Sequence, residues 1–121
     1  MRILVVDDDP LAGAMTAAIL EEMGHETLLA EDGMDAVHQF NDDEGIGMIV
    51  SDMHMPLISG IDLFHEVREQ RQGLPFLLLT GDDPATLLAR EPRLDACLIK
   101  DFNLATELPR VIGEVLKRHP S

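Results

Sequence analysis

Acidic residues follow the first apolar run of the chain. Ile3–Val6 leads directly into three consecutive carboxylates, Asp7, Asp8 and Asp9. Carboxylates that converge in one crevice repel each other, and this repulsion raises a pKa unless a cation is present. Mg²⁺ prefers such hard oxygen ligands and would remove the repulsion. We therefore interpret Asp7 and Asp8 as candidate magnesium ligands, with a solvated acidic turn as the alternative explanation.

Later apolar runs also end in polar residues that could take part in chemistry. Asp52, Thr80 and Lys100 stand at or just after the ends of three of these runs. Aspartate can act as a nucleophile and form an aspartyl phosphate, and phosphoryl transfer depends mainly on positioning and charge neutralisation. Lys100 suits this chemistry as a point charge and Thr80 as a hydrogen-bond donor, and Gly81 leaves room for the incoming group. The set predicts a site that accepts a phosphoryl group.

Five short apolar runs alternate with segments of helical spacing. We predict strands over these runs, which are Ile3–Val6, Thr27–Ala30, Met48–Val50, Phe76–Leu79 and Ala96–Ile99. Strict alternation of strand and helix predicts an α/β fold, a doubly wound five-stranded parallel sheet with helices on both faces. In such a sheet the residues that follow the strands meet at one edge, where ligands bind.

The segments between the strands carry apolar stripes that we expect to face the core. The stripes comprise Leu11, Met15, Ala18, Ile19 and Met23; Met34, Val37 and Phe40; Ile61, Phe64 and Val67; and Leu104, Leu108, Val111 and Val115. Asp9, followed by Pro10, is more typical of a helix N-cap than of a metal ligand. A fourth helix begins after Asp83, and Pro92 limits it to about two turns.

Length and charge restrict the class of protein. The 121 residues form one domain, 1–121, and we interpret 117–121 as a tail or the start of a linker. No apolar run approaches the roughly 20 residues that span a bilayer, and the N-terminus does not have the pattern of a signal peptide. The net charge of −14 disfavours direct binding to nucleic acid or to other phosphate backbones. A single cysteine, Cys97, excludes an internal disulfide and is typical of a reducing cytoplasm.

Several motifs together identify a family resemblance. VVDDDP at 5–10, VSDMHMPLISG at 50–60, LPFLLLTG at 74–81 and LIKDF at 98–102 occur in this order. With these motifs, and with GHE and EDG in the second strand–helix unit, the chain resembles the receiver domain of two-component response regulators over essentially its whole length. The resemblance implies a flavodoxin-like sheet with strand order 2-1-3-4-5.

The resemblance also implies roles for the site residues. Asp52 would be the phospho-acceptor, and Asp8 a direct ligand of Mg²⁺ or Mn²⁺. Asp7 would act on the metal mainly through water, and the backbone carbonyl of His54 would be a further ligand. Thr80 and Lys100 would bind the phosphoryl group.

A receiver takes its phosphoryl group from a partner and passes a signal on. The donor would be the phosphohistidine of a sensor histidine kinase or phosphotransfer protein, or a small donor such as acetyl phosphate. Phosphorylation would change the face formed by the fourth helix, fifth strand and fifth helix, and so change binding of a downstream partner or output domain. Slow self-dephosphorylation would be the only turnover, so the chain is not predicted to be an enzyme in the ordinary sense.

Three positions depart from the family pattern. Cys97 replaces the usual aromatic residue at the switch position, and Asp101 replaces the proline that follows the lysine. Because a non-proline cis peptide costs about 3–4 kcal/mol, we expect a trans bond before Asp101. The stretch between Thr80 and Lys100 is shorter than usual, with Pro-Arg-Leu-Asp at 92–95. His54, Gly81 and Asp82 would lie at the rim of the pocket.

Two other functions compete with the phosphorylation switch. The missing aromatic residue and the short fourth helix would also suit a receiver-like adaptor that binds its partner without phosphorylation. The pair Asp7-x-Asp9 resembles a pattern of phosphatases and phosphotransferases in which the first aspartate is the nucleophile. That family needs further motifs and usually a cap domain, for which this chain has no room.

Overall fold

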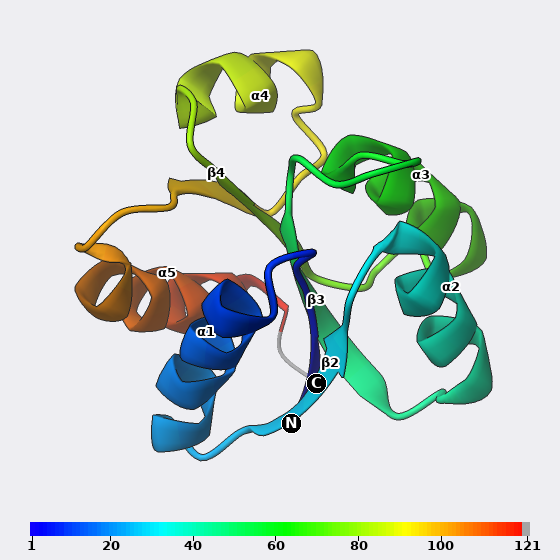
Figure 1. Ribbon diagram of the computed structural model, residues 1–121, viewed down its shortest axis with the longest axis horizontal. Helices are drawn as coiled ribbons and strands as arrows, with labels where there is room; N and C mark the ends of the chain where they lie inside the picture. Colours follow the sequence, from blue (N-terminus) through cyan, green and yellow to red (C-terminus); the bar gives the residue numbers. More distant parts are fainter. Residues whose placement is uncertain (120–121) are drawn as a thin grey trace.

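Five strands alternate with five helices in the computed structural model, which describes residues 1–119 (Figure 1). The strands are β1 (Arg2–Val6), β2 (Glu26–Ala30), β3 (Ile46–Asp52), β4 (Phe76–Thr80) and β5 (Ala96–Ile99). The helices are α1 (Pro10–Glu22), α2 (Gly33–Asp42), α3 (Gly60–Gln70), α4 (Pro84–Arg90) and α5 (Leu104–Arg118). All five predicted strands are confirmed, and the seven-residue α4 is as short as expected.

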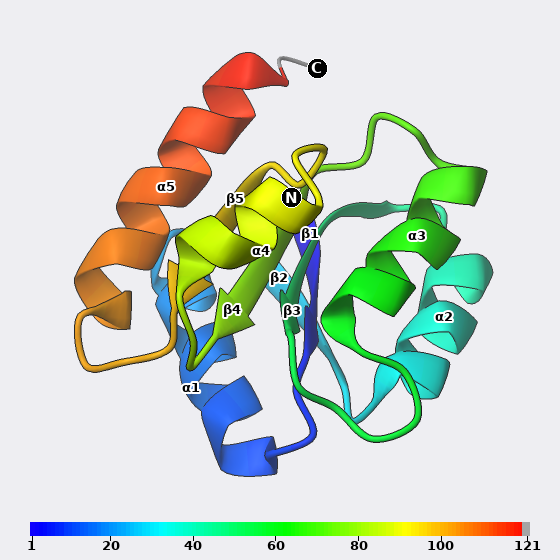
Figure 2. The ribbon, with the colours of Figure 1, turned by 90° about the horizontal axis from the view of Figure 1, so that it is seen from above.

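The strands form one parallel sheet in the order β2-β1-β3-β4-β5, as predicted. Helices α1 and α5 cover one face of the sheet, and α2 and α3 cover the other (Figures 1 and 2). Helix α4 packs on the side of α2 and α3, since its Leu87 belongs to the same apolar cluster as the buried face of α3. Because every strand runs in the same direction, all carboxyl ends lie at one edge of the sheet.

Strand β1 divides its side chains between two cores. Ile3 and Val5 pack with α1 and α5, whereas Leu4 and Val6 pack with α2 and α3. This alternation is the period of two expected of a strand that is covered on both faces. Both faces are therefore anchored in the strand that leads into the acidic run.

The apolar stripe predicted for the first helix is wrong at three of its five positions, because Leu11, Met15 and Ala18 are exposed. Leu11 and Met15 are 71% and 63% exposed, whereas Ile19 packs against the core. The buried residues of α1 are Gly13, Thr16, Ala17 and Leu20. The helix turns its small residues inward because it approaches the end of β1 closely: a Cβ at Gly13 would lie 3.4 Å from the Cβ of Asp7. Met34 of α2 is also exposed, against expectation.

The helix ends follow the predicted capping residues. The Asp9 side chain accepts a hydrogen bond from the Leu11 amide at 3.0 Å, and the Asp83 side chain caps α4 in the same way. At its other end α5 includes Lys117 and Arg118, so these two residues are helical and do not form a tail. Residues 120–121 lie outside the described part of the chain, and a linker there stays a prediction. Within residues 1–119, no helix combines the length and apolar character needed to cross a membrane.

A buried carboxylate fixes the loop between α4 and β5. Glu91 accepts hydrogen bonds from Arg93 Nε at 2.8 Å and Nη2 at 3.0 Å, and its Oε1 lies 2.8 Å from His65 Nε2. The hydrogen bonds from Arg93 lower the pKa of Glu91 to about 2. A carboxyl whose pKa falls on folding stabilises the folded state above its unfolded pKa, and this stabilisation is lost as the pH falls towards 2.

We expect Glu91→Gln to lower the free energy of unfolding by about 1–2 kcal/mol at neutral pH. The difference from wild type should shrink as the pH falls below about 4.5, because the wild-type carboxylate then becomes protonated in the unfolded state. Urea unfolding at a series of pH values measures this, with the exposed Glu69→Gln as the matched control. A loss of unfolding free energy that does not change with pH would contradict the lowered pKa of Glu91.

Candidate functional site

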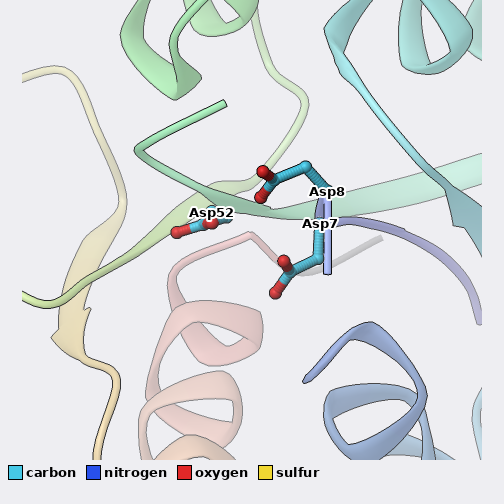
Figure 3. Close-up of side chains that lie close together, drawn as sticks. All are labelled: Asp7, Asp8 and Asp52. Atoms are coloured by element: carbon cyan, nitrogen blue, oxygen red, sulfur yellow. The ribbon is translucent and has the colours of Figure 1, made fainter. Parts of the chain in front are cut away.

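Three aspartates meet where β1 and β3 end side by side (Figure 3). Carboxylate oxygens of Asp7, Asp8 and Asp52 all lie within 4.8 Å of one another. Asp7 and Asp52 are buried, whereas Asp8 is exposed. The sheet therefore brings together the acidic residues that the sequence predicted as one site, although they are more than forty positions apart along the chain.

Lys100 supplies the positive charge next to this cluster. Its Nζ lies 2.7 Å from Asp7 Oδ2 and 3.4 Å from Asp52 Oδ2. Its backbone amide donates to the Thr80 carbonyl at 2.6 Å, which fixes the start of the β5–α5 loop against the end of β4. Burial alone would lower the pKa of Lys100, but the hydrogen bond to Asp7 and the charge of Asp52 raise it above its usual value. Lys100 is therefore held in its charged form.

The charge balance around Asp52 is unfavourable for a carboxylate. Burial raises the pKa of Asp52, and the negative charge of Asp7 raises it further, although Lys100 acts in the opposite direction. One ammonium group thus does not neutralise three neighbouring carboxylates. A cation bound among the aspartates would favour the ionised, nucleophilic form of Asp52.

The residues present fit a magnesium ion. They provide hard oxygen donors from two strand ends, close enough together to bind one ion, and they carry excess negative charge. The exposed position of Asp8 leaves the cluster open to water, which magnesium retains in most protein sites. The role predicted for the His54 backbone carbonyl stays a prediction.

Thr80 and Gly81 form the neighbouring wall of the site. The Thr80 side chain is fully buried, and its Oγ1 accepts a hydrogen bond from the Asp82 amide at 3.0 Å. A threonine hydroxyl that accepts one hydrogen bond still has its own hydrogen to donate. A Cβ at Gly81 would have no heavy atom within 4 Å, so there is open space beside this residue. The roles predicted for Thr80 and Gly81 in binding a phosphoryl group stay predictions.

Two of the three predicted rim residues, His54 and Asp82, contact each other. His54 Nε2 lies 2.8 Å from Asp82 Oδ2, and both side chains are largely exposed. The sequence did not indicate that these two would pair, because their pairing depends on the conformations of two loops. An exposed pair of this kind contributes little to stability.

The departures from the family pattern have clear structural counterparts. Cys97 is buried in the apolar cluster on the α4 side of the sheet, and burial raises the pKa of its thiol to about 11. The thiol therefore stays protonated, as expected of a packing residue. The peptide bond before Asp101 is trans, as predicted, and Asp101 Oδ1 accepts a hydrogen bond from the Asn103 amide at 2.9 Å.

One glycine of the site has a role that the sequence analysis did not identify. A Cβ at Gly60 would lie 2.7 Å from the backbone carbonyl oxygen of Asp52. Any larger residue would push α3 away from the end of β3. The signal in the sequence was the glycine eight positions after Asp52, but only the close approach explains why it is needed.

Comparisons with known proteins agree with this geometry. A family model described as the response regulator receiver domain matches residues 3–111. A transcriptional regulatory protein CpxR homolog from Haemophilus influenzae is 32% identical over 122 residues, which cover 99% of this chain and 52% of that protein. The chain therefore spans about half the length of this curated relative.

Solved structures share the fold closely. The response regulator TrrA from Thermotoga maritima, crystallised in complex with Mg²⁺-BeF, has a TM-score of 0.86 and 30% identity and covers 95% of this chain and 98% of its own. A crystal structure of the histidine kinase ThkA in complex with TrrA matches with a TM-score of 0.79, 30% identity and coverage of 95% and 97%. On the match of the family model to most of its length, this chain belongs to the family of response regulator receiver domains.

Proposed function

We propose that this receiver domain is a phosphorylation-dependent switch with Asp52 as its phospho-acceptor. The observation that carries the proposal is the position of the Asp52 carboxylate, which is buried beside two further aspartates and lies 3.4 Å from Lys100 Nζ. Such a site holds a nucleophile together with the charges that a phosphoryl group needs.

The transfer step uses few groups of the chain. A carboxylate oxygen of Asp52 attacks the phosphorus of a phosphohistidine, and the P–N bond breaks with its electron pair going to the imidazole. Lys100 and the Thr80 hydroxyl bind the oxygens of the transferred group. Mg²⁺, or Mn²⁺ in its place, would be held by Asp7, Asp8 and Asp52 and would neutralise charge on the phosphoryl group.

The partners follow from this chemistry. The donor is a sensor histidine kinase or phosphotransfer protein, as the complex of TrrA with a histidine kinase supports. Loss of the phosphoryl group by slow hydrolysis resets the switch, and the family is one of signalling domains that are generally not catalysts. Direct binding to nucleic acid by this domain is not expected at a net charge of −14. A cytoplasmic location, suggested by the single cysteine, belongs to the proposal.

The domain must transmit its signal without the aromatic side chain that the family usually has at the position of Cys97. Cys97 has no ring that could turn towards a displaced threonine. The hydrogen bond from the Lys100 amide to the Thr80 carbonyl, at 2.6 Å, links the phosphoryl-binding residues directly to β5. We propose that a shift of Thr80 and Lys100 moves the α4–β5–α5 face through this link, which biases a two-state element by a local charge event.

The alternative functions are not favoured. Burial of charged groups is costly. An adaptor that acts without phosphorylation would therefore have no use for the buried carboxylate of Asp52. A phosphatase-like use of Asp7 is opposed by the position of this carboxylate, which lies 2.7 Å from Lys100 Nζ and is engaged with it.

Binding of beryllofluoride, which replaces the phosphoryl group, tests the proposal. In the presence of Mg²⁺, beryllofluoride at about a hundred times its dissociation constant should stabilise the domain by about 2.7 kcal/mol. Thermal unfolding should show this rise for wild type and only a small rise for Asp8→Asn. NMR spectra should shift at Asp52, Thr80 and Lys100. No change in the wild type under any Mg²⁺ concentration would contradict the proposed function.

A further inference from the structure

A cavity opens at the edge of the sheet where the strands begin, opposite the acidic site. Its volume is about 760 Å³, which lies within the range of pockets that bind small molecules. The wall comes from the end of α3, the loop between α4 and β5, and the end of α5, all of which lie at this edge (Figure 2). Its ionisable side chains are His65, Arg68, Glu69, Arg93, Asp95 and His119.

The buried Glu91 holds two basic side chains in the wall. Its carboxylate binds Arg93 Nε at 2.8 Å and Nη2 at 3.0 Å, and it lies 2.8 Å from His65 Nε2. Arg93 Nη1 and His65 Nδ1 make no hydrogen bond to any residue within 1–119. The side chains of His65 and Arg93 are 50% and 60% exposed, whereas that of Glu91 is 9% exposed. A ligand in the cavity would therefore meet the two bases and not the acid that holds them.

Asp95 holds two further bases. Its Oδ1 lies 2.6 Å from His119 Nε2, and its Oδ2 lies 3.8 Å from Arg68 Nη2. The guanidinium groups of Arg68 and Arg93 both lie over the ring of Phe64, with Cζ at 4.7 Å and 5.4 Å from its centroid. Stacking and ion pairing thus position the bases before a ligand arrives, which lowers the entropy cost of binding.

The balance of charge at this cavity differs from that of the whole chain. The chain has a net charge of −14 and only nine Lys and Arg residues, yet three arginines gather here. They face three carboxylates, so each histidine that gains a proton adds an uncompensated positive charge. The groups counted are Arg68, Arg93 and Arg118, whose Nη2 donates to the Asp95 carbonyl, and Glu69, Glu91 and Asp95. The cavity can therefore attract anions that the net charge of the chain repels.

The elements around the cavity place charged groups near both histidines. Around His65 they are Glu91 and Arg93 of the α4–β5 loop and Asp62, Arg68 and Glu69 of its own helix; around His119 they are Asp95 directly before β5, Arg68 of α3, and Arg118 of its own helix. Histidine changes its charge between about pH 5 and pH 8, where carboxylates and guanidinium groups ordinarily keep theirs. The positive charge of the cavity should therefore increase as the pH falls through this range.

We propose that this cavity binds a small organic polyanion, a molecule that carries two or more carboxylate or phosphate groups. The bases come from three separate elements, so they can bind anionic groups at different ends of one ligand. A bound ligand would join the end of α3, the start of β5 and the end of α5. Because β5 and α5 belong to the face that phosphorylation is proposed to move, the ligand would be a second input to that face. Binding itself does not depend on phosphorylation of Asp52.

NMR titration of the ¹⁵N-labelled chain tests the proposal. The probes are citrate, a tricarboxylate, and pyrophosphate, a diphosphate, and EDTA keeps the acidic site free of metal. Arg93→Gln removes a base from the wall, and Glu69→Gln removes a competing carboxylate. Arg110→Gln is the matched control, because this arginine of α5 pairs with Glu107 and Glu114 and does not line the cavity.

At about pH 6 we expect at least one probe to bind wild type with a Kd of about 1 mM or below. The amide shifts should fall at the ends of α3 and α5 and in the loop before β5. Arg93→Gln should weaken binding about tenfold, and Glu69→Gln should strengthen it about threefold. The control should stay within about twofold of wild type. At about pH 8 wild type should bind about tenfold more weakly, because neutral histidines no longer attract the anion. The probe that binds more tightly identifies the anionic group of the ligand.

Shifts located outside the cavity, or equal shifts with chloride at the same ionic strength, would overturn the inference. Equal weakening by Arg110→Gln and Arg93→Gln would also overturn it, because general charge would then explain the binding. If Arg93→Gln does not fold, His119→Gln replaces it, since the glutamine amide can still donate to Asp95. This variant should bind the probe about fivefold more weakly, and unchanged binding would contradict the site.

Discussion

Asp52→Asn abolishes covalent labelling by acetyl phosphate in the presence of Mg²⁺, with a loss of at least about a hundredfold. The amide keeps the shape of the side chain but has no carboxylate oxygen to attack phosphorus. Intact-mass spectrometry of the labelled protein measures the effect. The matched control is Asp9→Asn, which lies in the same acidic run but caps α1, and asparagine is an equally good cap.

Although Asp52→Asn abolishes labelling, it should increase the stability of the fold. Burial and the charge of Asp7 raise the pKa of Asp52, so its ionised form destabilises the folded state at neutral pH. Without Mg²⁺, Asp52→Asn should therefore increase the free energy of unfolding at neutral pH. The gain should disappear as the pH falls below the unfolded pKa, where the carboxyl is protonated in both states. Labelling that survives the substitution, or a loss of stability, would contradict the role of Asp52.

Lys100→Met should both slow labelling of the site and destabilise the fold. Removal of the ammonium group leaves the buried Asp7 carboxylate without the partner that lies 2.7 Å from it. Loss of one partner from a buried pair is strongly destabilising, and with Lys100 partly exposed we expect about 1–3 kcal/mol at neutral pH. Labelling by acetyl phosphate should slow by about a hundredfold, because one of the charges that bind the phosphoryl group is lost.

The stabilisation that Lys100 provides should decrease at high pH. Because the pKa of Lys100 is raised on folding, its contribution is present in full below its unfolded pKa and is lost as the pH rises through the folded value. The difference between wild type and Lys100→Met should therefore shrink in strong alkali. Chemical unfolding across this range measures it, with the exposed Lys117→Met as control. An equal loss in the control would show that general charge, and not the pair with Asp7, is responsible.

Sequence patterns could predict the sheet and the residues at its edge. Val-, Ile- and Leu-rich runs identify buried parallel strands, and the direction of the strands then places Asp7, Asp52 and Lys100 together. The inward face of α1 could not be read in this way. Apolar periodicity favoured Leu11 and Met15, but close approach to β1 places the small residues inward.

Details that depend on loop conformation could not be predicted from the sequence either. The pairing of His54 with Asp82 joins two loops whose conformations no local pattern specifies. Leu57 has a positive φ of 72°, which the sequence does not indicate, because leucine gives no signal for this conformation, whereas glycine or asparagine would have done so. The convergence of residues at the ends of strands was therefore predictable, and the contacts between loops were not.

The position of the phosphoryl group is the most direct test of the account. Wild-type protein is treated with acetyl phosphate and Mg²⁺, digested, and examined by tandem mass spectrometry under conditions that preserve acyl phosphates. We predict one phosphoryl group on the peptide that contains Asp52 and none on the peptide that contains Asp7 and Asp8. A phosphoryl group on Asp7, or no labelled aspartate at all, would contradict the assignment of Asp52 as the acceptor.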